Sequence, residues 1–536
     1  MSAMIVAPQP LAVEEGAKAL QRGGNAVDAA VVCAFAQMIL SPQMCGIGGY
    51  ALLTLHLPGA PAQNLALDAP ALAGRRVAPD MWREALIRPS SRGWGYLLKD
   101  RVNALGYTSI CTPGAVKGLA TILARWGTFT WAEALAPAIH IAEEGFMVDS
   151  HLAQGWKEPA SSPEELSLMD YILANAEARR IYLRADGSPY DVGDHFRNPD
   201  YGRTLRELAE RGSEDFYRGA LARRIAADLE VNGSYVTAGD LENYAVREDQ
   251  PLRGSYRGYE IATSRPPHGG ATLLEILNIL EGYDLAALGH NSPAYIYLVS
   301  MAMKAAFADR NPLLADPLFA DVPTDWMISK ERAAAWRSRI DAGAPIMVSF
   351  SAGESPHTTH VSVIDDAGMA VALTHSLGAS SGVITPGLGF MYNNSMINFH
   401  PLPGHPNSIA PGKGRTTGMT PTIITRAGRP ALVIGAPGAT RIITSIAQVI
   451  LNVLDFGMSV SDAVLAPRFD CQGDVIRCQA RIPEYVCAEV RQRHPIERLP
   501  YSHGGLALVH AIQVDEQTGK LAGAADAGAG GMALEV

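Results

Sequence analysis

The strongest constraint on the fold is a strand signal in the last third of the chain. Two apolar, β-rich runs, at residues 359–364 and 369–374, flank the turn Asp-Asp-Ala-Gly at residues 365–368. This pattern predicts a β-hairpin. The first run opens with Thr358 and follows residues 342–357, which have weak periodicity and which we expect to form a mobile tail.

Thr358 is a candidate nucleophile. Cleavage between His357 and Thr358 would free the α-amine of Thr358, and that amine can act as the general base for the hydroxyl of the same residue. Threonine is also a good strand former, so the hairpin taken alone favours a structural role. Motifs along the rest of the chain instead favour the role of nucleophile.

Short motifs stand in one order on both sides of Thr358. Those that precede it lie at residues 23–30 (Gly-Gly-Asn-Ala-Val-Asp-Ala-Ala), 45–49 (Cys-Gly-Ile-Gly-Gly), 112–116 (Thr-Pro-Gly-Ala-Val), 266–270 (Pro-Pro-His-Gly-Gly) and 307–310 (Phe-Ala-Asp-Arg). Those that follow lie at residues 358–360 (Thr-Thr-His), 374–377 (Thr-His-Ser-Leu), 393–399 (Asn-Asn-Ser-Met-Ile-Asn-Phe), 419–422 (Met-Thr-Pro-Thr), 435–444 (Gly-Ala-Pro-Gly-Ala-Thr-Arg-Ile-Ile-Thr), 466–469 (Ala-Pro-Arg-Phe) and 523–526 (Gly-Ala-Ala-Asp). Over nearly its whole length the chain resembles the γ-glutamyltransferase family of N-terminal-nucleophile hydrolases.

This resemblance implies an α+β fold, a four-layer α-β-β-α sandwich. It also implies a precursor that cuts itself into a large subunit, residues 1–357, and a small subunit, residues 358–536, which stay together as a heterodimer. The local patterns agree with mixed helices and antiparallel hairpins. We expect helices at residues 11–22, 26–40 (capped by Asn25), 292–309, 441–454 and 461–465, and strands at residues 46–57, 359–364, 369–374, 422–425, 431–434, 506–509 and 512–514.

The composition and charge of the chain limit the kinds of partner and cofactor that we expect it to bind. The net charge of −10 over 536 residues comes without a basic stripe, so we expect no nucleic-acid partner. Residues 1–10 lack the pattern of a secretory signal, and the apolar run at residues 26–40 is too short to span a bilayer, so we expect a cytoplasmic protein with no membrane partner. The six cysteines are sparse and lack metal-ligand spacing, so we interpret them as buried hydrophobic residues and expect neither a metal nor another cofactor.

The resemblance also assigns roles to other residues. Ser376 falls where the family has a hydroxyl that hydrogen-bonds the nucleophile and assists self-cleavage, and Thr374 is expected on the same face of that strand. The family uses two adjacent backbone amides, here those of Gly438 and Ala439, to stabilise the oxyanion.

Three departures from the family concern the glutamyl headgroup. An arginine that binds the substrate carboxylate is missing, because residues 66–70 read Ala-Leu-Asp-Ala-Pro. Asn398 replaces an aspartate that pairs with the substrate ammonium, and Thr417 and Gly418 replace two serines. Arg415 is the remaining candidate for holding an acid group, although it is equally well read as a surface arginine. The segment at residues 399–415 is short and predicts a site without a lid.

We therefore predict a self-cleaving threonine amidohydrolase or acyltransferase that acts through an acyl-enzyme on a small amide substrate. The acyl group is expected to bear a carboxylate, as in the glutaryl and oxamate branches of the family. Two alternatives stay open: a genuine γ-glutamyl transferase or hydrolase acting on glutathione-type substrates, and a non-catalytic binding relative.

Overall fold

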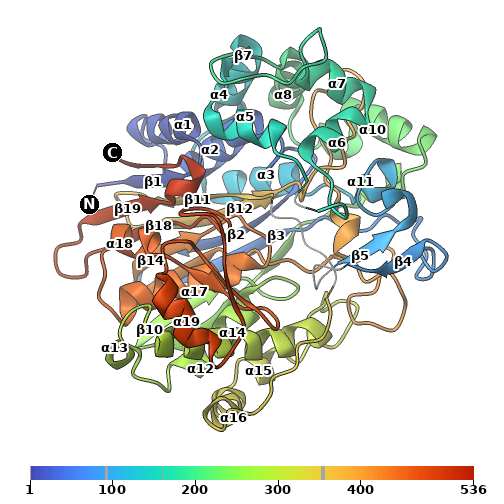
Figure 1. The fold of residues 1–536 in the computed structure, drawn as a ribbon. Coiled ribbons are helices and arrows are strands. Elements are labelled where there is room, and N and C mark those ends of the chain that lie inside the picture. The colour runs from blue at the N-terminus through green and yellow to red at the C-terminus, as the bar shows by residue number, and fades with distance from the viewer. Residues whose placement is uncertain (1, 91–94, 161, 352–356) are drawn as a thin grey trace.

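The computed structural model describes residues 2–90, 95–160, 162–351 and 357–536 (Figure 1). Two β-sheets lie face to face, and helices cover the outer face of each sheet. The predicted four-layer sandwich of an α+β protein is confirmed.

The first sheet is antiparallel throughout and has the strand order β20-β1-β11-β12-β2-β3-β8. Its two central strands, β11 and β12, form the predicted hairpin. The strands that flank this pair, β1 and β2, both come from the N-terminal part of the chain, and the C-terminal strand β20 lies at the sheet edge beside β1. The bounds are β1 Met4–Ala7, β2 Tyr50–Leu57, β3 Gln63–Ala69, β8 Arg247–Asp249, β11 Thr359–Ile364, β12 Ala370–Ser376 and β20 Met532–Glu535.

The second sheet has the order β19-β18-β14-β13-β10-β9 and is also antiparallel. The prediction of a strand at residues 506–509 is wrong. There Leu508 N–H donates to the Pro437 carbonyl (3.1 Å), so the segment binds a loop instead of joining the ladder. The bounds are β9 Leu252–Tyr256, β10 Tyr259–Thr263, β13 Thr422–Arg426, β14 Arg429–Gly435, β18 His510–Val514 and β19 Leu521–Ala525.

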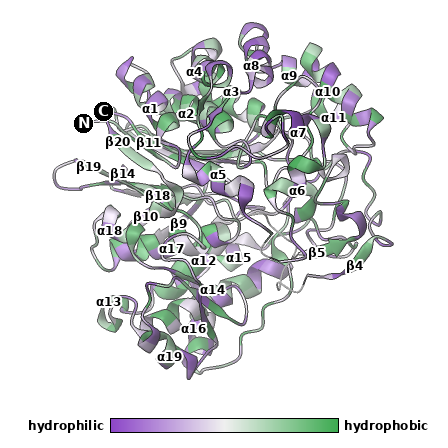
Figure 2. Ribbon diagram, turned by 45° about the horizontal axis from the view of Figure 1, so that its top comes forward, coloured by the Kyte–Doolittle hydropathy of each residue, from purple (hydrophilic) through white to green (hydrophobic). Residues whose placement is uncertain are grey.

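Apolar helices form the outer layers. In Figure 2 the central helix α2 is largely hydrophobic, whereas the outer helix α8 is largely hydrophilic. Asn25 caps α2 with a reciprocal capping box, as predicted. The first sheet is covered by α1 Pro10–Gln21, α2 Ala26–Leu40 and α3 Ala115–Trp126, with α4 Trp131–Glu144 packed on α2. The second is covered by α12 Gly270–Leu280, α17 Arg441–Leu454 and α18 Val460–Leu465, with α14 Pro293–Leu313 and α16 Lys330–Asp341 packed on α12.

Two predicted boundaries shift by four residues, and the others by at most two. The strand expected from residue 46 begins at Tyr50, because Gly49 N–H donates to the Gly46 carbonyl and closes a turn first. The helix expected to end at residue 309 continues to Leu313.

The remaining α-helices and strands lie outside the two main sheets and the helices that cover them. They are α5 Ser150–Lys157, α6 Leu168–Leu173, α7 Ala176–Tyr182, α8 Pro199–Arg211, α9 Asp215–Arg218, α10 Ala220–Val231, α11 Ala238–Glu242, α13 Leu285–Leu288, α15 Thr324–Met327, α19 Glu484–Arg491, β4 Leu86–Pro89, β5 Tyr96–Leu98, β6 Phe146–Met147, β7 His195–Phe196, β15 Phe469–Asp470, β16 Ile476–Cys478 and β17 Ile496–Arg498.

Further sequence expectations concern the cysteines, the membrane and the tail. All six cysteines are free and buried, which confirms their interpretation as small core residues. In the described part of the chain, no helix combines the length and the apolar character needed to cross a membrane. Of the predicted tail, residues 352–356 lie outside the described residues, residues 344–350 form neither helix nor strand, and Ile346 is buried.

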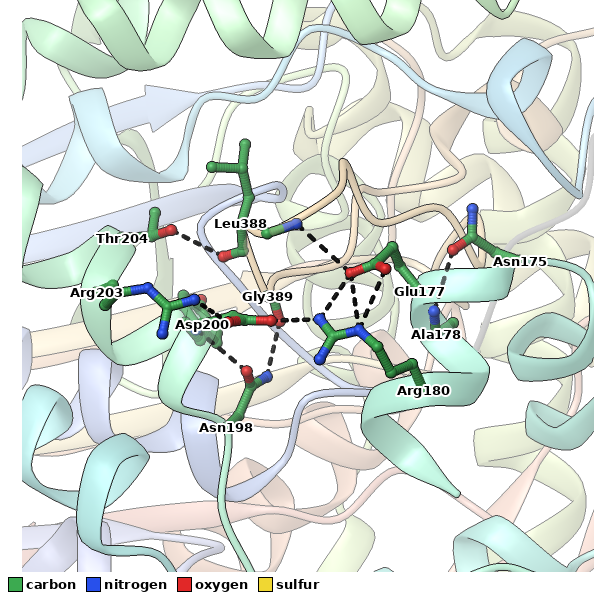
Figure 3. Close-up of polar contacts among 12 residues, drawn as sticks. Asn175, Glu177, Ala178, Arg180, Asn198, Asp200, Arg203, Thr204, Leu388 and Gly389 are labelled. Atoms are coloured by element: carbon green, nitrogen blue, oxygen red, sulfur yellow. Dashed lines mark hydrogen bonds and ion pairs between the residues drawn. The ribbon is translucent and has the colours of Figure 1, made fainter. Parts of the chain in front are cut away.

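Segments from before and after Thr358 are interlocked, as Figure 3 shows for the loop at Leu388 and Gly389. Asn198 Nδ2 donates to the Gly389 carbonyl (2.8 Å), and Thr204 Oγ1 donates to the Leu388 carbonyl (2.9 Å). Gly389 has a φ of 76°, and a Cβ there would lie 2.2 Å from the backbone nitrogen of Tyr201. These contacts hold the two parts of the chain together independently of the bond between them.

The two sheets also meet at a buried histidine. His360 on β11 bonds to Thr374 through Nδ1 (2.8 Å) and to Ser362 through Nε2 (2.9 Å). Burial lowers the pKa of His360 well below its usual value, so the ring is neutral. A Cβ on Gly435 of β14 would lie 2.1 Å from the His360 ring, so the second sheet approaches this closely only because residue 435 is a glycine.

We predict that Gly435→Ala lowers the free energy of unfolding by about 1–3 kcal/mol, because the added methyl group overpacks the contact with His360. Thermal unfolding of the purified variant measures the change. Gly473→Ala is the matched control, since a Cβ at that position meets no atom within 4 Å. Equal stability of the two variants would contradict this account of the sheet contact.

Candidate active site

The register of three strands places three hydroxyl side chains in a row. Thr359 pairs with His375, which sets Thr358 opposite Ser376, and Ser376 pairs in turn with Tyr50 on β2. Thr358 is 3% exposed and lies at the start of β11. Because side chains of paired residues share a face of the sheet, the row Thr358–Ser376–Tyr50 faces one side.

Ser376 lies at the centre of the hydrogen bonds in this row. Its Oγ accepts from Tyr50 Oη (2.9 Å) and from Gly378 N–H (2.9 Å), and it donates to the carbonyl oxygen of His357 (2.6 Å). Thr358 Oγ1 lies 3.1 Å from Ser376 Oγ and 2.7 Å from the same carbonyl. The carbonyl of the predicted cleavage site is thus polarised by a hydroxyl and lies beside the predicted nucleophile.

Thr374 is not brought to Thr358. It pairs with His360 one step further along the ladder, and its hydroxyl is hydrogen-bonded to the His360 ring. Sequence reasoning placed Thr374 on the correct face of the strand but could not show which neighbour it contacts.

The loop between β14 and α17 carries the predicted oxyanion donors. The backbone N–H groups of Gly438 and Ala439 form no hydrogen bond to any residue that the structure describes. Gly438 has a φ of 139°, and a Cβ there would lie 2.6 Å from Ala507 Cα, so only glycine fits. Ala439 is left-handed with a φ of 58°, a conformation that is costly for any residue with a Cβ. Two adjacent amides are therefore held in a strained loop without an acceptor in the part of the chain that the structure describes.

Arg415 is buried, contrary to its reading as a surface arginine, and lies against the hydroxyl row. It is 3% exposed, and its Cζ lies 4.0 Å from the centroid of the Tyr50 ring. Nη1 donates to the Thr416 carbonyl (3.1 Å), while Nε has no hydrogen-bond partner among the described residues. Burial raises the pKa of the neighbouring Cys111 thiol to about 12, and the charge of Arg415 opposes that shift.

The other predicted substrate-binding residues are buried on adjoining segments. Asn407 Nδ2 donates both to the Asn398 carbonyl (2.7 Å) and to Thr416 Oγ1 (3.1 Å), which ties the two segments together. A Cβ on Gly418 would lie 2.3 Å from the Ala439 carbonyl, so the turn at Thr417 and Gly418 abuts the oxyanion loop.

Sequence reasoning missed three residues. Tyr50 looked like an ordinary strand residue, and no local signal distinguishes it. His268 stood within a recognised motif but received no role, and Asp68 was noted only as part of the segment that lacks the family arginine. In the structure Asp68 Oδ2 lies 3.0 Å from His268 Nε2, and His268 Nδ1 lies 2.9 Å from Thr417 Oγ1.

Among the described residues, no group of three or more His, Cys, Asp or Glu side chains is arranged to hold a metal ion. The residues described above bring hydroxyl, amide, guanidinium, imidazole and carboxylate groups to this site.

Known proteins share this architecture and sequence. The crystal structure of the cephalosporin acylase from Bacillus halodurans superimposes with a TM-score of 0.86 and 27% identity, over 99% of this chain and 95% of that one. The Acylase ACY 1 proenzyme of Pseudomonas sp. (strain V22) is 38% identical over 97% of this chain and 91% of its own length. The glutathione hydrolase proenzyme of Escherichia coli (strain K12) is 32% identical over 88% and 81%, respectively.

The sandwich and these similarities define an amide hydrolase or acyltransferase of the N-terminal-nucleophile class, made as a precursor that processes itself into two subunits. The family model for gamma-glutamyltranspeptidase matches residues 12–536, and the chain belongs to that family. The predicted family and class are confirmed, and the alternative of a non-catalytic relative is set aside.

We predict that Ala439→Gly raises the free energy of unfolding by about 1 kcal/mol, because glycine adopts the left-handed conformation without the Cβ penalty. Chemical denaturation of the folded protein measures it. Ala522→Gly is a suitable control, since Ala522 lies within strand β19 and has no positive φ, so glycine there should destabilise instead. A loss of stability in Ala439→Gly comparable to that of the control would refute the assignment of strain.

Proposed function

We propose that the mature enzyme hydrolyses amides of small acyl groups that end in a carboxylate, with a glutaryl group as the reference case. Cleavage between His357 and Thr358 produces subunits of residues 1–357 and 358–536, and Thr358 then acts as nucleophile with its own α-amine as base. The hydrogen bond from Ser376 to the His357 carbonyl supports this cleavage point, since it stabilises the negative charge that develops there.

The catalytic cycle follows from the same groups. Thr358 Oγ1 attacks the substrate carbonyl, and the unpaired amides of Gly438 and Ala439 stabilise the oxyanion. The amine product leaves as the Thr358 ester forms, and water then hydrolyses the ester to release the acid. Ser376 keeps the Thr358 hydroxyl in place, since the two oxygens lie 3.1 Å apart.

Arg415 is the single observation that carries the substrate assignment. A buried guanidinium with an unpaired Nε and no described carboxylate partner is unfavourable unless an anion binds beside it. Its stacking on Tyr50, which in turn bonds to Ser376, connects this cation to the predicted nucleophile. A carboxylate on the acyl group balances the charge of Arg415 and accepts hydrogen bonds from its guanidinium N–H groups.

The site has fewer charged groups that could bind a γ-glutamyl headgroup. Ala66 stands on β3 where the family arginine is expected, and Asn398 carries no charge to pair with an α-ammonium. The names of the acylase relatives agree with an acyl group other than γ-glutamyl. The similarity to glutathione hydrolases leaves the γ-glutamyl alternative open.

We predict that Ser376→Ala slows self-cleavage by about 10²–10³-fold, the usual effect of losing one oxyanion donor, and that Thr358→Ala abolishes it. A denaturing gel followed over time resolves the precursor of 57.1 kDa from products of about 38 and 19 kDa. Ser338→Ala on the exposed side of α16 is the control and should process normally. N-terminal sequencing of the smaller product must begin at Thr358; any other start contradicts the cleavage point.

We predict that wild-type enzyme prefers glutaryl anilide to γ-glutamyl anilide by at least about 10²-fold in kcat/KM, because two charged anchors for the glutamyl headgroup are absent. Arg415→Met should lower kcat/KM for glutaryl anilide by about 10²-fold and leave an uncharged acyl anilide little affected. Arg429→Met, at an exposed position at the start of β14, is the matched control.

Oxamate and glutathione complete this substrate panel. Efficient cleavage of glutathione together with inactivity on glutaryl amides would establish the γ-glutamyl alternative instead. In that case Asn398→Asp, which otherwise should shift preference towards α-amino substrates, would have little effect.

A further inference from the structure

The Ser376 hydroxyl has more polar neighbours than one hydroxyl group can bond. Among the described residues, four polar atoms lie close to Ser376 Oγ: the His357 carbonyl oxygen (2.6 Å), the Gly378 nitrogen (2.9 Å), Tyr50 Oη (2.9 Å) and Thr358 Oγ1 (3.1 Å). A hydroxyl group offers one proton and two lone pairs, so it forms at most three regular hydrogen bonds. One of the four contacts is therefore left over.

The chemistry of the neighbours decides which contact that is. A carbonyl oxygen can only accept, so the single proton of Ser376 goes to His357. A backbone N–H can only donate, so Gly378 occupies one lone pair. With its proton committed, Ser376 can only accept from Tyr50, and the phenol occupies the second lone pair. Nothing remains for Thr358, whose hydroxyl lies 2.7 Å from the same His357 carbonyl.

Burial and packing make the bond from Tyr50 decisive. Tyr50 is 6% exposed and Ser376 is 1% exposed, so bulk water does not supply a substitute donor. The two residues are paired across β2 and β12, and the Tyr50 ring is also held against Arg415. If Tyr50 lacked its hydroxyl, Ser376 would have an empty lone pair, and the nearest described hydroxyl that could fill it belongs to Thr358.

We propose that Tyr50 is a positioning residue that makes Ser376 an obligate hydrogen-bond donor. In the precursor this fixes the Ser376 proton on the His357 carbonyl oxygen, which becomes negative when Thr358 Oγ1 attacks the carbonyl carbon. The Thr358 hydroxyl proton passes to the Thr358 nitrogen as the C–N bond breaks, and water then hydrolyses the ester that has formed. The inference rests on the proposed function, in which Thr358 is the nucleophile.

The same constraint acts in the mature enzyme. Cleavage turns His357 into a terminal carboxylate, which must move away before a substrate reaches Thr358. The lone pairs of Ser376 remain occupied by Tyr50 and Gly378, so Ser376 can only donate to Thr358 Oγ1. The Thr358 hydroxyl proton is then left for the α-amine of the same residue, which is the direction that base catalysis requires.

The first experiment follows self-cleavage of newly synthesised precursor in a cell-free translation reaction, by pulse labelling and a denaturing gel. Tyr50→Phe keeps the ring and removes only the hydroxyl, and it should slow cleavage about fivefold to tenfold, the usual effect of losing one hydrogen bond. Tyr295→Phe on α14 is the matched control, because the buried Tyr295 Oη has no hydrogen-bond partner among the described residues. It should process at the wild-type rate.

A double variant separates positioning from structural support. If Tyr50 acts through Ser376, then adding Tyr50→Phe to Ser376→Ala should not slow cleavage beyond the rate of Ser376→Ala alone. A loss of packing or stability would instead slow both backgrounds by the same factor. Thermal unfolding of Tyr50→Phe in the uncleaved Thr358→Ala chain checks that the fold is kept.

The second experiment uses mature enzyme after cleavage has gone to completion. Tyr50→Phe should lower kcat about fivefold to tenfold for both glutaryl anilide and the uncharged valeryl anilide, with little change in KM. The preference for the glutaryl substrate should stay at the wild-type value, because the phenylalanine ring keeps the contact with Arg415.

Wild-type rates of cleavage and turnover in Tyr50→Phe overturn the inference and leave the proposed function intact. Equal slowing of the wild-type and Ser376→Ala chains by Tyr50→Phe also overturns it. Self-cleavage that depends on Tyr50, together with a wild-type enzyme that does not prefer glutaryl anilide, supports the inference and overturns only the substrate assignment. A wild-type chain that never cleaves itself overturns both.

Discussion

The pairing of β11 with β12 is the constraint on which the rest of the site depends. Its register sets Thr358 opposite Ser376, and the next pairing adds Tyr50 to the same row. A shift of one residue would turn every side chain of the hairpin to the other face of the sheet. Thr358 would then point at α2, where Thr359 and His375 now bond to Gln37. The proposed nucleophile, its hydroxyl partner and the tyrosine that contacts Arg415 are thus positioned by one ladder of backbone hydrogen bonds.

A close contact between the sheets gives that ladder a fixed environment. The His360 ring bonds to Thr374 and Ser362 of its own hairpin and fills the space left by Gly435 on the opposite sheet. The strained loop at Gly438 and Ala439 begins three residues after that glycine, so the contact that fixes the distance between the sheets also helps to place the proposed oxyanion donors. Close packing makes this dependence strict, because cores respond to changes of a single methyl group.

Charge then gives the site its proposed selectivity. Arg415 brings a buried positive charge that no described carboxylate balances, and His268, which contacts Asp68, bonds to Thr417 two residues further along the chain. Unbalanced buried charge is costly in an empty protein and favourable only when a complementary ligand enters. The site lacks the two charged anchors for a γ-glutamyl headgroup but keeps the buried charge of Arg415, and this combination favours an acyl group with one carboxylate.

The sequence by itself determined the family, the sandwich, the hairpin at β11 and β12 and most helix positions, because these follow from motifs and from hydrophobic periodicity that is local in the chain. By resemblance it also predicted an oxyanion loop and a cleavage site. Only the tertiary structure decided that Thr374 bonds to His360 and that residues 506–509 serve a loop instead of a strand. It also decided that Tyr50 joins the hydroxyl row with Arg415 against its ring, and that His268 contacts Asp68 and Thr417. Tyr50 and Arg415 are 365 positions apart, and no local pattern records such a contact, since it arises only when sheet register and loop packing bring distant segments together.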